Sequence, residues 1–388
     1  MRKVLFVILV FCLLIDCAIS GAANSTGALA SSASYTWDEA SATKITFTQD
    51  AAQVQGSGAS AAGAVVTISG AGTYVLSGEC ADGRVVVDAG KNDTVQLVLN
   101  NVTLTCKTTS PIYAKKADTV VLILADGSVN TISDTAGYVF EEGTDEPDAT
   151  VFVKNNLIIS GNGSLTVNGN YRNAIAAKDD LTIYGGNISV TAINDGLRGR
   201  DSVTIFDGAI TVAAGNDGIK SNNDEDAAKG FIILNGGAFD IKAGRDGIQA
   251  ETSLTINGGT YTIVTGGGSA NAPTRTEEFR GGGWNGGTFV MPQQPPQAGL
   301  PIQPAQTESA AETDDSMKAL KCGTALTISG GDFTIDAEDD AVHSNADVSV
   351  TGGVFEIQSG DDGFHADSAL RIDGGDINIA KAYEGLEG

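Results

Sequence analysis

The sequence predicts an all-β protein, built as a right-handed, single-stranded parallel β-helix with three sides and about 22 residues per coil. Three observations support this fold class. The chain contains 50 glycines among 388 residues, roughly twice the usual share of about 7%, which disfavours long helices. A motif recurs mostly at 22-residue spacing. Inside the motif, apolar and polar residues alternate, as they do in strands.

The repeat is centred on a glycine turn between two strand-like segments. In the unit at 326–335, apolar residues alternate on both sides of the glycine pair, and Val342 adds a third apolar position for the third side. Four of the six steps between repeats are 22 residues, one is 29 and one is 72. The second glycine of the turn stands at Gly186, Gly208, Gly237, Gly259, Gly331, Gly353 and Gly375.

Two other repeat classes use similar residues or a similar period. Leucine-rich repeats need a Leu/Asn signature and usually a helical return, whereas the return here is rich in Asp-Gly and lacks helix formers. Calcium-binding nonapeptide repeats combine glycine pairs with Asp, but their period is shorter than 22 residues. The parallel β-helix is therefore the better interpretation.

Composition divides the chain into segments. Residues 1–20 have the pattern of a signal peptide, 21–43 form an N-terminal linker, and 44–388 form the β-helix. A flexible Pro/Gly/Gln-rich insertion at 268–317 interrupts it. Residues 35–90 are expected to contain the strands that cap the first coil, because an open end exposes unpaired strand edges.

The first residues predict export. Arg2 and Lys3 precede an apolar run over 4–15, which is too short to span a membrane and is typical of a secretory signal. We expect a secreted or cell-surface protein without a membrane span, with a lipid anchor at Cys17 as the alternative. Because the sequence stops in mid-coil, self-association through the C-terminal coil is a further alternative.

The charge and the cysteines exclude several classes. Asp and Glu number 48 against 23 Lys and Arg, giving a net charge of -25, which repels nucleic acid and favours cations. The cysteines left after removal of 1–20 are Cys80, Cys106 and Cys322, and their spacing matches no metal or disulfide framework.

The fixed period converts repeated polar residues into columns, with neighbours about 4.8 Å apart. Stacked carboxylates repel one another unless backbone N–H groups or cations compensate them. Asp-Gly is also a favoured turn dipeptide, so turn chemistry and calcium binding both remain open. Nine residues after the second glycine stand Asp195, Asp217, Asp246, Asp340 and Asp362, with Asn173 and Glu384 extending the line. Three residues further stand Arg198, Lys220, Gln249, Lys321, His343 and His365.

Several long motifs point to a known family. IQSGDDGFHADSALRIDGGDINI from Ile357, NAIAAKDDLTIYGG from Asn173 and AYEGLEG from Ala382 closely resemble a secreted carbohydrate-binding β-helix family, similar to family 9 polysaccharide lyases. The resemblance implies calcium binding through acidic turn residues and adhesion to plant cell-wall polysaccharides such as cellulose and pectic acid. Lys318 takes the column position after the insertion and puts metal at that coil in doubt. The implied calcium ligands are Asp195, Asp217, Asp246, Asp339, Asp340, Asp361 and Asp362.

The leading hypothesis is a non-catalytic, calcium-dependent protein that binds cellulose or pectic polymers. Its expected carbohydrate contacts are Arg198, Lys220, His343 and His365. The first alternative is a polysaccharide lyase, in which calcium acidifies a uronate proton and Lys220, Arg198 or Lys321 removes it as base. The second alternative is a structural surface adhesin.

Overall fold

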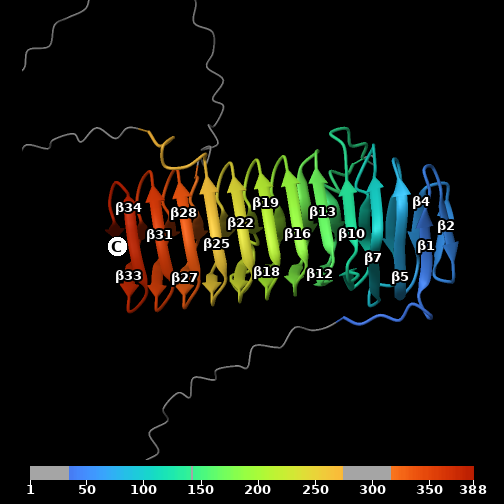
Figure 1. Ribbon diagram of the computed structural model, residues 1–388, viewed down its shortest axis with the longest axis horizontal. Helices are drawn as coiled ribbons and strands as arrows, with labels where there is room; N and C mark the ends of the chain where they lie inside the picture. The colour runs from blue at the N-terminus through green and yellow to red at the C-terminus, as the bar shows by residue number, and fades with distance from the viewer. Residues whose placement is uncertain (1–34, 141–142, 274–315) are drawn as a thin grey trace, which may run out of the picture.

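The computed structural model describes residues 35–140, 143–273 and 316–388. These residues form a three-sided parallel β-helix whose coils stack along the long axis (Figure 1), which confirms the predicted fold class. The predicted signal peptide, the alternative anchor Cys17 and most of the insertion lie outside the described residues. Within the described ranges, no helix has the length and apolar character needed to cross a membrane.

Three ladders of parallel strands form the sides. Ladder A contains β9 (Thr119–Leu124), β12 (Asn156–Gly161), β15 (Asp180–Ile183), β18 (Ser202–Ile205), β21 (Phe231–Leu234), β24 (Leu254–Ile256), β27 (Ala325–Ile328), β30 (Asp347–Val350) and β33 (Ala369–Ile372). Ladder B contains β10 (Val129–Ser133), β13 (Ser164–Gly169), β16 (Asn187–Ala192), β19 (Ala209–Ala214), β22 (Ala238–Ala243), β25 (Thr260–Thr265), β28 (Asp332–Ala337), β31 (Val354–Ser359) and β34 (Asp376–Lys381). The long β7 (Thr94–Thr105) pairs with both β9 and β10 and so joins the two ladders. β5 (Gly72–Cys80) pairs with β7 along both ladders.

Ladder C is made mostly of short strands. It contains β4 (Val65–Ile68), β6 (Arg84–Asp88), β8 (Ile112–Lys116), β11 (Ala149–Val153), β14 (Asn173–Ala177), β17 (Leu197–Gly199), β20 (Ile219–Ser221), β23 (Ile248–Ala250), β26 (Leu320–Cys322), β29 (Val342–Ser344), β32 (Phe364–Ala366) and β35 (Leu386–Glu387). β23 pairs directly with β26, as β24 does with β27 and β25 with β28. The coil therefore continues in register across the insertion.

Two antiparallel hairpins precede the regular coils. β1 (Thr43–Phe47) pairs with β2 (Ala52–Gln55), and β3 (Ala59–Ala62) pairs with β4. β1 also pairs in parallel with β5, and β4 with β6. The hairpins thus cover strand edges that the first coils would otherwise expose, as a solenoid end requires.

The glycine turns lie at the corner between ladders A and B. The second glycine of every repeat has a positive φ, between +105° and +131°, a region that residues with a side chain rarely adopt. A Cβ on Gly353 would lie 3.1 Å from the carbonyl oxygen of Gly331 in the preceding coil. Glycine at this corner therefore allows both the turn and the close stacking of coils.

Aromatic rings stack along the interior of ladder B. Phe239, Tyr261, Phe333 and Phe355 are buried, with successive ring centroids 4.6–4.7 Å apart and planes within 7° of parallel. The strand pairing places these residues opposite one another. Each ring therefore buries its faces against equivalent rings, which anchors the register of the C-terminal coils.

Replacing the ring in the middle of this stack should destabilise the β-helix strongly. Phe333→Ala leaves a cavity between two rings, and we expect a loss of about 3–5 kcal/mol in the free energy of unfolding, measured by urea denaturation. The matched control is Thr334→Ala on the same strand, whose side chain is exposed and whose replacement should change stability by about 0.5 kcal/mol or less. Similar losses in both variants would contradict the role of the stack.

Candidate functional site

The predicted aspartate column lies at the corner between ladders B and C. Asp195, Asp217, Asp246, Asp340 and Asp362 are each at most 3% exposed. A glycine follows four of them, and Ala341 follows Asp340, where the chain passes close to the next coil. A Cβ on Gly196 would lie 2.6 Å from the carbonyl oxygen of Gly218. Sequence spacing and tight packing together fix the column.

The second predicted column runs beside it on the outer face of ladder C. The strand register places Arg198 opposite Lys220, and Lys220 opposite Gln249. The same register continues from Gln249 through Lys321 and His343 to His365. The four predicted carbohydrate contacts therefore lie on one line parallel to the long axis, and the two histidine rings are 4.8 Å apart.

In every column residue except Asp362, one side-chain oxygen accepts a hydrogen bond from a backbone N–H of the next coil. These bonds hold successive corners together, and Asn173 begins the ladder with its amide oxygen. The acceptor Oδ1 atoms and the backbone N–H donors are Asn173 with Asp195 at 3.1 Å, Asp195 with Asp217 at 3.4 Å, Asp217 with Asp246 at 3.1 Å, Asp246 with Lys318 at 2.8 Å, and Asp340 with Asp362 at 3.0 Å.

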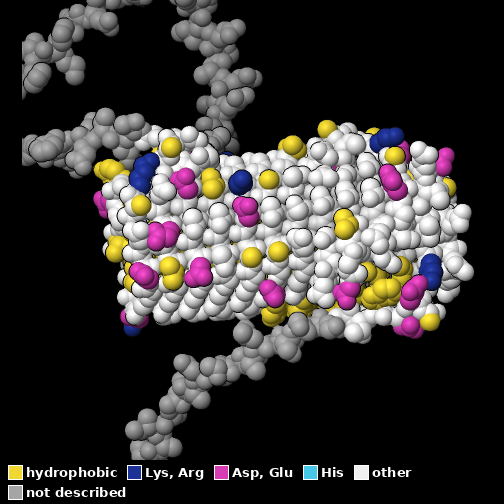
Figure 2. All heavy atoms as spheres, viewed as in Figure 1, with side chains coloured by type: hydrophobic (Ala, Val, Ile, Leu, Met, Phe, Trp, Pro, Cys, Tyr) yellow, Lys and Arg dark blue, Asp and Glu magenta, His cyan; other side chains and the backbone are white. Residues whose placement is uncertain are grey.

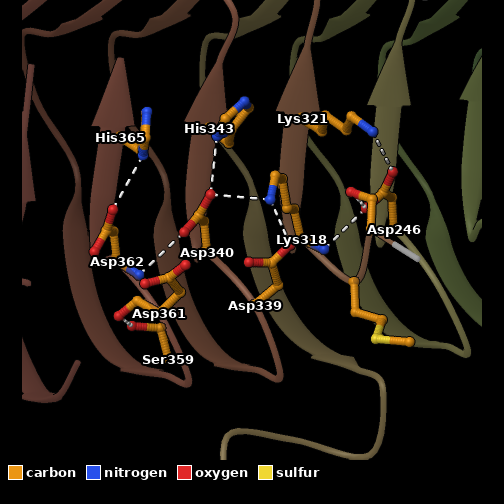
Figure 3. A network of polar contacts seen from close by, with 12 residues as sticks. Asp246, Lys318, Lys321, Asp339, Asp340, His343, Ser359, Asp361, Asp362 and His365 are labelled. Carbon is orange, nitrogen blue, oxygen red and sulfur yellow. Dashed lines mark hydrogen bonds and ion pairs between the residues drawn. The ribbon is translucent and has the colours of Figure 1, made fainter. Parts of the chain in front are cut away.

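The other carboxylate oxygen meets a cationic or imidazole group from the second column (Figure 3). The stacked negative charges are thereby compensated within the protein itself. The Oδ2 partners are Arg198 for Asp195 at 3.9 Å, Lys220 for Asp217 at 2.5 Å, Lys321 for Asp246 at 3.4 Å, His343 for Asp340 at 2.9 Å, and His365 for Asp362 at 3.0 Å.

The local balance of burial and charge differs along the column. Burial raises the pKa of Asp217, and Lys220 offsets only part of the effect. Burial also acts on Asp340, but His343 and Lys318 outweigh it and lower the pKa of this carboxyl to about 2. Asp340 is therefore a firmly ionised carboxylate with two positively polarised partners.

Lys220 is held in its charged form. Burial alone would lower the pKa of the Lys220 ammonium, but the carboxylates of Asp217 and Asp195 more than compensate, and the net shift is upward. A general base must give up its proton near the working pH. The environment of Lys220 therefore favours a binding role over proton abstraction.

Three groups of possible metal ligands occur in the described residues, and all lie in the C-terminal coils. In each group the ligand atoms are within 4.8 Å of one another, and Asp195, Asp217 and Asp246 belong to none of them. The groups are Asp339 with Asp340 and Asp361, Asp362 with His365 and Glu387, and Asp340 with His343 and His365.

The group of Asp339, Asp340 and Asp361 offers only carboxylate oxygens, the donors that calcium prefers. It borders a cavity of about 360 Å³ beside Met317. The ammonium of Lys318 already bonds to Asp339 and lies 3.0 Å from Asp340 Oδ2. A divalent cation that used all three carboxylates would have to displace this ammonium, so the sequence-based doubt about Lys318 has a structural basis.

The carboxylate of Asp362 is less completely hydrogen-bonded than those of the other column aspartates. Its Oδ1 atom is buried without a hydrogen-bond partner in the described part of the chain. Burial and the nearby Glu387 carboxyl raise the pKa of Asp362 to about 7, although the bond to His365 opposes them. A cation or a shared proton would relieve this arrangement, so the residues fit a bound metal.

Asp148 binds Arg198 and was not among the site residues predicted from the sequence. Both carboxylate oxygens of Asp148 bond to Arg198 Nη2, at 3.0 and 2.8 Å, and one of them also accepts a hydrogen bond from Asn173 at 3.1 Å. Asp148 lies between β10 and β11, in a stretch without the repeat spacing. The acidic composition of this stretch was the available signal, but composition does not predict the path of a loop.

Asp217 tests whether the column is structural. Asp217→Ala removes an acceptor for the Asp246 N–H and leaves Lys220 without its closest partner. We therefore expect the free energy of unfolding to fall by about 3 kcal/mol in calcium-free buffer. Asp217→Asn keeps the acceptor, as Asn173 does in the same column, and should lose about 1 kcal/mol. Urea unfolding measures both. Equal losses would show that the hydrogen bond between coils contributes little.

Asp340 should make the protein sensitive to acid. The pKa of Asp340 is lower in the folded state than in the unfolded state, so its ionisation contributes roughly 2 kcal/mol to the free energy of unfolding. This contribution is complete above about pH 4 and disappears as the pH falls towards about 2. The stability difference between the wild type and Asp340→Asn should shrink by that amount between pH 6 and pH 2 in chelator. Exposed Asp332→Asn is the control. A constant difference for Asp340→Asn would refute the prediction.

Comparison with known proteins agrees with this architecture. A carbohydrate-binding domain-containing protein of Acetivibrio thermocellus is 40% identical over 151 residues, which are 38% of this chain and 53% of that protein. The chain thus aligns with about half the length of that relative. A solved structure of the polysaccharide lyase-like protein from C. thermocellum, a gadolinium derivative, superposes with a TM-score of 0.57 and 40% identity over 58% of this chain and 92% of that one. Residues 62–363 match one family, so the chain belongs to the carbohydrate-binding domain-containing proteins.

Proposed function

We propose that the protein is a secreted, non-catalytic polysaccharide-binding protein that uses the outer face of ladder C and depends on calcium. The observation that carries the proposal is the register of ladder C, which repeats a polar or cationic side chain once per coil beside the aspartates. A polymer also repeats its groups, so weak contacts along such a face can add through multivalency.

The cationic members of the column suit the carboxylates of a uronate polymer. Arg198, Lys220 and Lys321 are partly exposed at 14–21% of their side-chain surface. They keep one side towards the buried aspartates and present the remainder to the surface. Charge-assisted hydrogen bonds to a uronate carboxylate or a sugar hydroxyl would use this exposed remainder.

Calcium has its best fit at the C-terminal coils. Asp339, Asp340 and Asp361 would hold it with oxygen ligands if Lys318 moves aside, and Asp362 offers an oxygen in the neighbouring group with His365 and Glu387. When bound there, calcium would neutralise carboxylates and bridge the acidic protein to an acidic polymer. Asp195, Asp217 and Asp246 remain predicted ligands, but their oxygens already have partners within the chain.

A polysaccharide lyase is the second candidate, supported by the similarity to a lyase-like protein. In that reaction a base would remove the proton next to a uronate carboxylate. The raised pKa of Lys220 opposes this role. Unsaturated uronide absorbance on polygalacturonate, lost in Lys220→Ala, would favour the lyase over the binding protein.

The binding proposal predicts calcium-dependent adhesion. The mature protein should bind calcium-gelled pectate and insoluble cellulose in pull-downs, and chelator should release it from the pectate. Asp361→Asn combined with Asp362→Asn should weaken calcium binding at least tenfold, because both changes remove charged oxygen ligands. Asp376→Asn, on an exposed side chain of β34, is the matched control. Folded protein that binds neither polymer with calcium present would refute the proposal.

A further inference from the structure

A groove of about 770 Å³ lies away from the aspartate column, at the corner between ladders A and B. One wall is the segment before β1, which runs along the lower edge of the β-helix in Figure 1. The other wall is the corner turns that follow β9, β12, β15 and β18. Its volume is in the range of small-molecule and sugar sites.

Aromatic rings line part of this groove. The ring of Tyr184 stacks on Phe206, with centroids 4.8 Å apart and planes within 3° of parallel. Tyr35 meets Tyr184 from the opposite wall at 6.0 Å, and Trp37 packs over an outer apolar cluster formed by ladder strands. Figure 2 shows hydrophobic side chains gathered along the same lower edge.

The aromatic residues at this corner are not required by the coil. Tyr184 and Phe206 occupy an outward position that the following coils fill with Asn235, Asn257 and Ser329. In those coils the position is a polar ladder, with Asn257 donating to Asn235 at 2.9 Å and Ser329 donating to Asn257 at 3.2 Å. Because Asn and Ser serve equally well there, the two aromatic rings call for another explanation.

The polar groups of the groove define its charge. Asp126 and Asp207 are exposed, and Asn162 donates from Nδ2 to Asp126 Oδ1 at 3.0 Å. The described lining includes carboxylates and amides but no Lys, Arg or His. An anionic uronate would meet only like charge here. A neutral sugar offers hydroxyls to the carboxylates and amides, and the C–H face of its ring packs on an aromatic side chain.

We propose that this groove is a second glycan site, specific for neutral pyranose chains, in which Tyr184 and Trp37 bind the sugar faces and Asp126 and Asn162 bind hydroxyls. The inference rests on the proposed polysaccharide binding and extends it. The two sites are at different corners of the β-helix, so the neutral and the anionic polymers would not compete for one surface.

Tryptophan fluorescence can report on the groove. The chain contains two tryptophans, so Trp284→Phe leaves Trp37 as the reporter. Cellohexaose, a neutral probe, should change the Trp37 emission, and hexagalacturonate should leave it unchanged. Tyr184→Ala should weaken cellohexaose binding at least tenfold, as should the double variant Asp126→Ala/Asn162→Ala, which leaves the ring stack intact. Asn257→Ala, in the same column as Tyr184 but outside the groove, is the matched control and should bind normally.

The outcomes separate this inference from the proposed function. Pectate pull-down without any cellohexaose response would overturn the neutral site and leave the proposed function standing. An equal response to hexagalacturonate, or unchanged affinity in the double variant, would overturn the inference as well. If deletion of residues 21–34 were needed before cellohexaose bound, the groove would be a docking place for that segment and the inference would fail.

Discussion

The rest of the structure depends on one constraint, the fixed register between coils. Each coil pairs with the next in parallel at about 4.8 Å, so each repeated residue lies beside the equivalent residue of the neighbouring coil. For apolar residues this is favourable, as the stack through Phe239, Tyr261, Phe333 and Phe355 shows. For carboxylates it is costly, because like charges are brought together in a buried corner. The aspartate column is possible because four of its five carboxylates bind both a backbone N–H of the next coil and a positively polarised side chain.

This division of the two oxygens explains why turn chemistry and charge compensation need not be competing interpretations. Oδ1 of Asp217 performs the turn role by accepting the Asp246 N–H, while Oδ2 meets Lys220. Where the pattern changes, as at Asp362, a buried oxygen lacks its hydrogen bond and the pKa rises. Metal binding is therefore best supported where the internal compensation is incomplete, in the C-terminal coils.

Much of the fold was predictable because the glycine turn recurs mostly every 22 residues in the sequence. The spacing from Asp195 to Asp217, or from Arg198 to Lys220, becomes a contact through the strand register. The coil was also expected to continue beyond the insertion, because the 72-residue step equals one 22-residue repeat plus the 50 residues of 268–317. The contribution of Asp148 was not predictable, because it lies outside the repeat and reaches Arg198 only through the path of a loop. Nor was the groove, since the packing of Tyr35 and Trp37 on ladder strands depends on a segment without periodicity.

The same reasoning separates two kinds of surface on one rod. Regular columns such as the one through Lys220 and Lys321 repeat a single group and suit a repeating polymer, but their chemistry is limited by the compensation they provide to the aspartates. An irregular segment laid over a regular corner can create a pocket with mixed walls, as Trp37 and Tyr184 do. The acidic lining of that pocket and the cationic side chains of ladder C favour opposite ligands. A cell wall that mixes neutral and uronate chains would present both ligands at once, so two weak sites on a rigid rod could act together through their effective concentration.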